Sequence, residues 1–156
     1  MISMHKKPII ISNFLAGALI ALGLLFTGCA SVPLASYEAD QVAKKFTEPT
    51  DRTASIYIYR NSFVGQGLKK TVRLDNQPIG DTANMVYFHR TVKPGLHQLS
   101  TESEFGYNTL SFTANAGMTY FFEQYIKMGV FVGGSNLKEV SETEGKINVL
   151  KCHLAQ

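Results

Sequence analysis

The chain has 156 residues, 45% of them hydrophobic and 17% charged, and its formal net charge is +3. This length fits one domain. Two of the cations, Lys6 and Lys7, precede an apolar segment near the N-terminus, and the rest of the chain holds 13 basic and 12 acidic residues. Such a balance gives no indication of nucleic-acid binding.

The first predicted element is a secretory signal peptide over residues 1–28. An uncharged apolar run extends from Phe14 to Phe26 behind the two lysines. As a helix it would rise about 20 Å, whereas the hydrocarbon core of a membrane is about 30 Å thick. A cleaved signal peptide is therefore expected in preference to a permanent membrane span.

The end of the apolar run resembles the lipobox of bacterial lipoproteins. Residues 25–29 read LFTGC, with small residues directly before the cysteine. The resemblance implies cleavage between Gly28 and Cys29 and a diacylglycerol on the thiol of Cys29. Phe26 departs from the small or aliphatic residue usual at its place. The alternative is an ordinary cleaved signal peptide in which Cys29 is incidental.

The residues after the cysteine predict the destination of the lipoprotein. The two positions after Cys29 hold Ala30 and Ser31, and neither is the Asp that typically retains lipoproteins in the inner membrane. By resemblance to sorting in Gram-negative bacteria, the expected address is the periplasmic face of the outer membrane. Three acyl chains on one cysteine exceed the two signals needed for stable anchoring.

Residues 29–53 are expected to form the lipidated N-terminus and a tether. They are mostly small and polar, with Pro33 and Pro49 as helix breakers. One short helix over residues 36–46 is predicted because Ala39, Val42, Ala43 and Phe46 fall on one helical face. Fully extended, residues 30–53 would reach about 80 Å from the membrane.

The predicted folded domain covers residues 54–156 and is all-β. Alternating side chains and Gly, Pro and Asn turns predict short strands without intervening helices. This pattern indicates an antiparallel β-sandwich of about seven strands, immunoglobulin-like or PEGA-like, or a small barrel. The predicted strands lie at residues 54–60, 70–75, 85–92, 96–102, 108–114 and 118–126, with a further strand-like run at 128–136, and residues 75–78 (DNQP) are expected to turn.

The C-terminal residues predict a short helix packed on the sandwich. Ser141 and Glu144 form a capping box, and Ile147, Leu150 and Leu154 recur at helical spacing. A final strand is the alternative, because Leu150, Cys152 and Leu154 also alternate.

Four segments together carry a family resemblance: ASIYIYRNSFVGQG (54–67), VRLDNQPIGDTA (72–83), YFHRTVKPGLHQLSTES (87–103) and AGMTYFFEQYIKMG (116–129). Over residues 50–154 the chain resembles small proteobacterial lipoproteins classed only as a domain of unknown function. Residues 72–117 also look like the PEGA type of β-sandwich repeat. The resemblance implies a sandwich fold and brings no catalytic residue with it.

Three groups of residues are candidates for catalysis or ligand binding. Residues 65–71 (GQGLKKT) lack the spacing of a P-loop, so a hairpin loop is expected there. His97 with Ser100 and Asp81 is the best hydrolytic set, but no nucleophile-elbow pattern supports it. The histidines lack metal-ligand spacing. No catalytic residue, metal site or cofactor is therefore predicted, and Cys152 among apolar neighbours is expected to be buried, with a reactive thiol as the alternative.

The apolar run at residues 128–136 has two interpretations. Its glycines and its residues Val130, Phe131 and Val132 are consistent with a core strand buried on both faces. The alternative is an exposed edge that, together with Phe63 and Val64, forms a partner surface for an envelope protein or cell-wall component. The function expected is a non-enzymatic, lipid-anchored binding or structural module. A small periplasmic hydrolase or thiol-dependent enzyme is the alternative.

Overall fold

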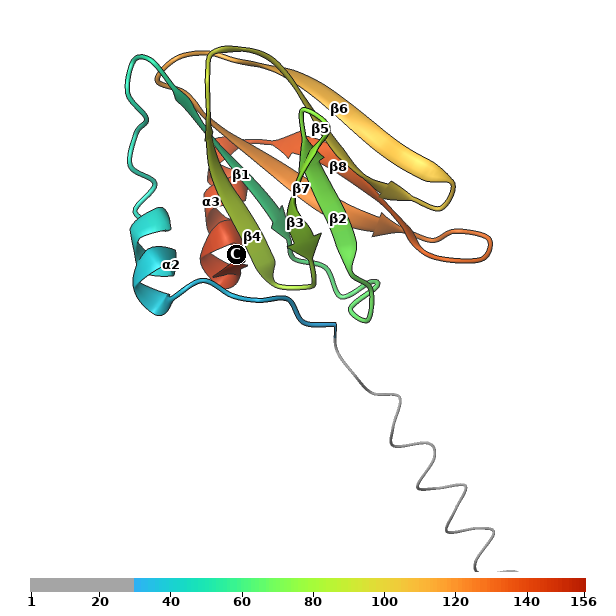
Figure 1. The fold of residues 1–156 in the computed structure, drawn as a ribbon. Coiled ribbons are helices and arrows are strands. Elements are labelled where there is room, and N and C mark those ends of the chain that lie inside the picture. The colour runs from blue at the N-terminus through green and yellow to red at the C-terminus, as the bar shows by residue number, and fades with distance from the viewer. Residues whose placement is uncertain (1–29) are drawn as a thin grey trace, which may run out of the picture.

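The computed structural model describes residues 30–156, so the signal-peptide prediction and Cys29 lie outside the described residues. The described chain forms two β-sheets, with one helix before the first strand and a second helix before the short last strand (Figure 1). The elements are α2 (Tyr37–Ala43), β1 (Ala54–Arg60), β2 (Lys70–Leu74), β3 (Gln77–Thr82), β4 (Val86–Val92), β5 (Gly95–Ser103), β6 (Gly106–Ala114), β7 (Thr119–Lys127), β8 (Gly134–Val140), α3 (Glu142–Lys151) and β9 (His153–Leu154).

The two-sheet β architecture is confirmed, but the antiparallel arrangement and the strand number are corrected. The five-stranded sheet has the order β8-β7-β1-β4-β9 and the four-stranded sheet the order β3-β2-β5-β6. In the first sheet β1 is parallel to β7, and β4 is parallel to β9. Parallel neighbouring strands need a long crossover connection. Between β1 and β7 the chain forms β4 of this sheet and all four strands of the other sheet. The five-stranded sheet is therefore mixed.

The turn between β2 and β3 forms where DNQP predicted it. Asp75 and Asn76 both have positive φ, 50° and 66°, as a two-residue hairpin turn of type I′ requires. The chain then continues as β3, which the sequence did not predict because it includes Pro78. Proline is tolerated in this strand because β3 lies at the edge of its sheet.

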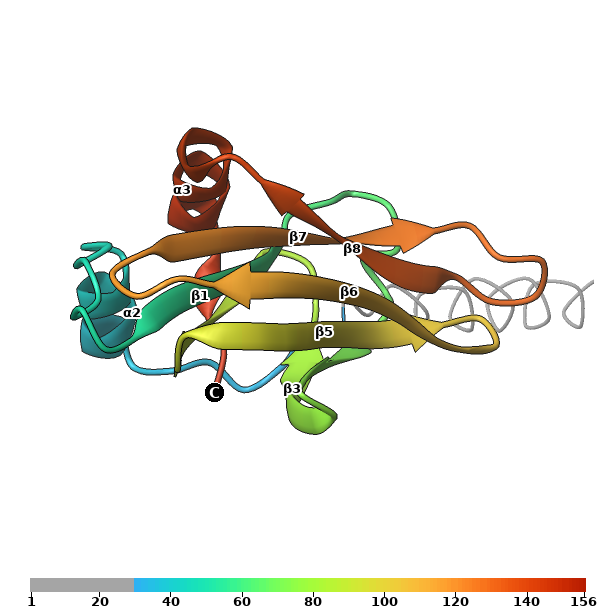
Figure 2. The ribbon, with the colours of Figure 1, turned by 90° about the horizontal axis from the view of Figure 1, so that it is seen from above.

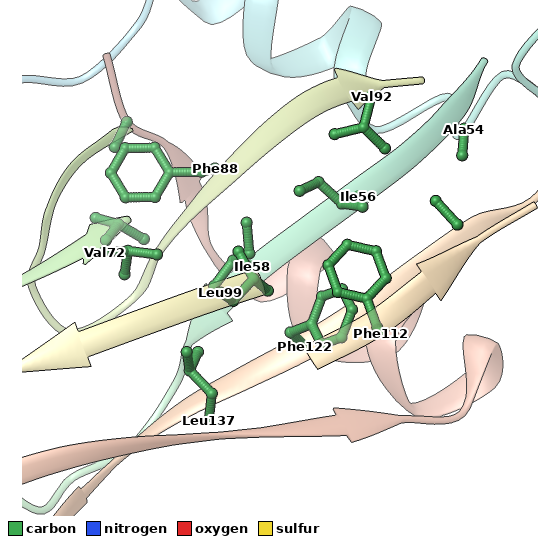
Figure 3. Close-up of a cluster of buried hydrophobic side chains, with 13 residues drawn as sticks. Ala54, Ile56, Ile58, Val72, Phe88, Val92, Leu99, Phe112, Phe122 and Leu137 are labelled. Carbon is green, nitrogen blue, oxygen red and sulfur yellow. The ribbon is translucent and has the colours of Figure 1, made fainter. Parts of the chain in front are cut away.

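The main core fills the space between the sheets. Ile56 and Ile58 of β1 have no exposed surface, and Figure 3 shows them in this core together with Phe122 of β7 and Phe88 of β4. Phe122 also packs against Phe112 of the facing sheet, with ring centroids 4.8 Å apart. These contacts between the sheets fix their stacking.

A second apolar cluster covers the outer face of the five-stranded sheet. Tyr57, Tyr59 and Tyr87 point outward from their strands, yet each is at most 1% exposed. Val149 of α3 and Ala43 of α2 pack against this cluster. All seven residues of β1 are therefore buried, although the strand alternates as predicted.

The C-terminus combines the two predicted alternatives. Ser141 caps α3, and its hydroxyl accepts a hydrogen bond from the Glu144 N–H at 3.2 Å. The helix ends at Lys151, and His153 and Leu154 then pair with β4 as the short strand β9.

The residues expected to form a tether are packed against the domain at their N-terminal side. The Ala35 N–H donates to Leu154 O at 2.9 Å, and Leu34 bridges to Ala155. Val32 packs against the main core. The predicted helix is present but shorter, over Tyr37–Ala43 rather than 36–46. Residues 30–43 therefore follow the surface of the domain.

None of the helices within residues 30–156 is long and apolar enough to cross a membrane.

Candidate binding surface

One end of the molecule exposes a cluster of large apolar side chains, here called the apolar tip. The β5–β6 and β7–β8 hairpins both project at this end, and α2 lies at the other end in both views (Figures 1 and 2). Phe63 is 86% exposed and Phe131 is 80% exposed. The apolar tip consists of Phe63, Val64, Phe105, Met128, Val130, Phe131 and Val132.

Of the three loops that carry these side chains, loop 128–133 touches both of the others. The Phe105 and Phe131 rings meet edge to face with centroids 6.5 Å apart. A Cβ at Gly65 would lie 2.7 Å from Ile126 of β7, and a Cβ at Gly133 would lie 2.8 Å from Leu68. Loop 61–69 therefore packs on the base of the β7–β8 hairpin, next to the loop that carries Phe131.

Arg60 supports the first of these loops from inside. Its side chain, at the end of β1, has no exposed surface. The guanidinium donates to Leu68 O at 2.7 Å and also to Gly65 O. Burial lowers the pKa of Arg60. Carbonyl groups that accept from a buried cation are held firmly, because either partner left alone would be costly.

Glu104 supports the second loop. Its carboxylate accepts hydrogen bonds from the backbone N–H groups of Val130 at 2.9 Å, Phe131 at 2.5 Å and Val132 at 3.3 Å. The bond from Phe131, followed by that from Val130, lowers the pKa of Glu104. Gly129 permits this turn, since a Cβ there would lie 1.9 Å from Val132 O. The exposed apolar residues thus sit on an ordered backbone.

Glu104→Gln should loosen the 128–133 loop without unfolding the domain. The neutral amide keeps only one accepting oxygen, so the N–H groups of Val130 and Phe131 lose charge-assisted partners. Because the folded pKa lies below the ordinary 4.5, the carboxylate orders the loop above pH 4.5 and stops doing so as pH falls through the folded pKa.

Amide NMR measures this effect directly. In the unmodified chain the amide shifts of residues 130 and 131 should titrate in acid, and in Glu104→Gln they should not. Glu139→Gln, at an exposed site on β8, is the matched control and should keep the titration. Amide shifts that are the same in Glu104→Gln and in the control would contradict the role of Glu104.

Comparisons with known proteins identify the family of the chain. A family model described as "Protein of unknown function (DUF2846)" matches residues 50–135. The chain belongs to the DUF2846 family. An uncharacterized protein of Haemophilus influenzae (strain ATCC 51907 / DSM 11121 / KW20 / Rd) is 45% identical over 142 residues, covering 91% of this chain and 84% of the relative. Loops 61–69, 104–105 and 128–133 all fall inside the part that matches the DUF2846 model.

The predicted surface residues Phe63, Val64, Val130, Phe131 and Val132 are all exposed in this DUF2846 chain. The core-strand interpretation of residues 128–136 is wrong for its first part, because 128–133 is a loop and only 134–136 enters β8. Residues 65–71 do not form a hairpin loop either, since residues 61–69 connect β1 in one sheet to β2 in the other and residues 70 and 71 belong to β2.

Four residues that form or support the apolar tip were not among the predicted surface residues: Arg60, Glu104, Phe105 and Met128. The two charged residues act through backbone groups up to 28 positions away, which no local pattern reveals. Phe105 and Met128 each stand beside a glycine, Gly106 and Gly129, and this turn signal was available.

The hydrolytic set considered from the sequence is not assembled. His97 Nδ1 lies 2.7 Å from Asp75 Oδ2, and its Nε2 lies 2.8 Å from Lys93 O. Asp81 instead accepts a hydrogen bond from Thr71 at 2.7 Å. Ser100 is only 4% exposed. His97 therefore ties the β2–β3 turn to the start of β5.

The thiol of Cys152 is buried, as expected. It has no exposed surface, and burial raises its pKa to about 12. A thiol with this pKa carries almost no thiolate at neutral pH, and thiolate is the reactive form. Within residues 30–156, no three His, Cys, Asp or Glu side chains are grouped so that they could hold a metal ion.

Proposed function

We propose that this protein is a lipid-anchored lipoprotein of the periplasmic face of the outer membrane, acting there as a non-enzymatic binding or structural module. Anchoring is supported by the sequence at Thr27, Gly28 and Cys29, which follows an apolar run of signal-peptide length. The absence of Asp from the two positions after Cys29 supports the outer membrane.

The observation that carries the binding role is the apolar tip. Folded monomers rarely leave large contiguous apolar patches uncovered, and such patches mark interaction sites. The support of two loops by Arg60 and Glu104 favours a built surface over loose loops. An apolar surface fits another apolar surface, of an envelope protein or a membrane, better than it fits the hydroxyl groups of a cell-wall glycan.

The alternative function as a hydrolase or thiol-dependent enzyme has less support. Its best nucleophiles are Ser100 and Cys152, and both are buried. A nucleophile in a hydrolytic site needs a base within hydrogen-bond reach and an opening to substrate.

The anchoring part of the proposal is tested by metabolic labelling with a palmitate analogue. We expect the unmodified chain to incorporate the label and to fractionate with the outer membrane. Cys29→Ser should lose the label completely, because the hydroxyl does not accept the diacylglycerol, and Cys152→Ser is the matched control that should keep it. Labelling of Cys29→Ser at the level of the control would contradict the proposed lipid anchor on Cys29.

A further inference from the structure

The start of the described chain lies next to loop 61–69, which carries part of the apolar tip. The Ala30 N–H donates to Gln66 O at 3.3 Å, in the loop that carries Phe63 and Val64. The next residues are held by the C-terminus, since the Gln156 N–H donates to Pro33 O at 3.1 Å and its side-chain amide donates to Leu34 O at 2.9 Å. Residues 30–35 are therefore bound along the domain and do not form a free linker between it and Cys29.

This attachment fixes how far the domain can move from a lipid on Cys29. One residue of chain spans at most about 3.6 Å. A lipidated Cys29, one residue before Ala30, would begin within a few such lengths of loop 61–69. The bilayer surface would then lie against the end of the domain that bears the apolar tip.

The chemistry of this end fits a bilayer surface. Its exposed side chains are mainly aromatic and branched, and the exposed Lys69 and Lys127 stand at the sequence ends of two of its loops. Lys127 lines a shallow depression together with Phe105 and Met128. The Glu104 carboxylate is turned toward backbone N–H groups of its neighbouring loop. Apolar side chains bordered by lysines are typical of surfaces that enter the headgroup layer of anionic membranes.

We propose that the apolar tip inserts into the interfacial layer of the same membrane that holds the lipid anchor, so that the domain sits directly on the bilayer. This proposal rests on the proposed lipidation of Cys29 and names the bilayer as the partner of the tip. The tip then acts as a second membrane contact that sets the orientation, and α2, at the opposite end, faces away from the membrane (Figure 2).

Tryptophan fluorescence can test this orientation, because the chain contains no tryptophan. Phe63→Trp and Phe131→Trp place single probes on the apolar tip. Tyr37→Trp, on α2 and 73% exposed in the unmodified chain, is the matched control at the other end. Each replaces one exposed aromatic ring by another, so the denaturant midpoint should be unchanged and can be checked.

The full-length lipoprotein, extracted from cell membranes, is reconstituted into vesicles of phosphatidylethanolamine and phosphatidylglycerol with brominated acyl chains. We expect the emission at positions 63 and 131 to shift to the blue and to lose most of its intensity by contact with the bromines. The emission at position 37 should match that in unbrominated vesicles.

Flotation of the same vesicles separates the two claims. If the protein floats with the vesicles and the probes at 63 and 131 are quenched no more than the probe at 37, the inserted tip is overturned while the anchor stands. The apolar tip would then be free for a protein partner. If the protein does not float, the proposed lipid anchor is overturned. The proposed orientation depends on that anchor and is then overturned as well.

Discussion

Replacing Phe122 by Ala should lower the free energy of unfolding by about 3–5 kcal/mol. Phe122 is fully buried between the sheets, and its ring packs 4.8 Å from that of Phe112, so truncation leaves a cavity in the main core. Phe131→Ala removes the same atoms from an 80% exposed site and should change stability by less than about 0.5 kcal/mol.

Denaturant midpoints of the two variants, measured side by side, check this prediction. The comparison keeps the chemistry constant and varies only burial. A loss for Phe131→Ala as large as that for Phe122→Ala would return the 128–133 loop to the core and remove the apolar tip as an exposed surface.

Asp40→Ala should cost about 3 kcal/mol and release α2 from the C-terminus, because it breaks a buried charged pair. Asp40 is 6% exposed, and its carboxylate accepts from Lys44 Nζ at 2.7 Å and from the Leu154 N–H at 2.9 Å. Burial by itself raises its pKa, but the hydrogen bonds from Lys44 and Leu154 outweigh burial, so the pKa lies below the ordinary 3.8. The stabilisation is therefore present above pH 3.8 and is lost as pH falls through the folded pKa.

Hydrogen exchange of the Leu154 amide, together with the denaturant midpoint, measures this effect. The amide should exchange faster in Asp40→Ala. Gln41→Ala, at an exposed position of the same helix, is the control and should change the free energy of unfolding by less than about 0.5 kcal/mol. Equal midpoints for the two variants would show that Asp40 does not hold α2 in place.

The strand alternation was a sound guide to where strands lie, and a weak guide to how they pair. Residues 54–60 were predicted as a strand, and β1 has those bounds. The period of two says which side chains share a face, but it carries no information on chain direction. The parallel pairing of β1 with β7 depends on how the chain crosses between the sheets, so it could not be predicted.

The helix on the N-terminal segment shows a similar limit. Apolar spacing placed Val42 and Ala43 on one face of the predicted helix, but Val42 is 62% exposed, and the charged Asp40 is buried along with Ala43. Asp40 is buried because Lys44 and the Leu154 N–H satisfy its carboxylate. A partner 114 positions away in sequence is invisible to local patterns.

The apolar tip was found in part from the sequence. Val130, Phe131 and Val132 stood out as apolar residues among glycines, and the interpretation as a strand failed because Gly129 closes a tight turn. The contact of this loop with Glu104 and with loop 61–69 is tertiary. Only the structure brings the three loops to one end.

The claim that Cys29 is the acylated first residue of the mature chain is tested most directly by intact mass spectrometry of the protein extracted from cell membranes. The account predicts a chain that starts at Cys29 and carries a diacylglyceryl group on its sulfur and a further acyl chain on its amino group. A chain that retains residues 1–28, or one with an unmodified Cys29, would contradict it.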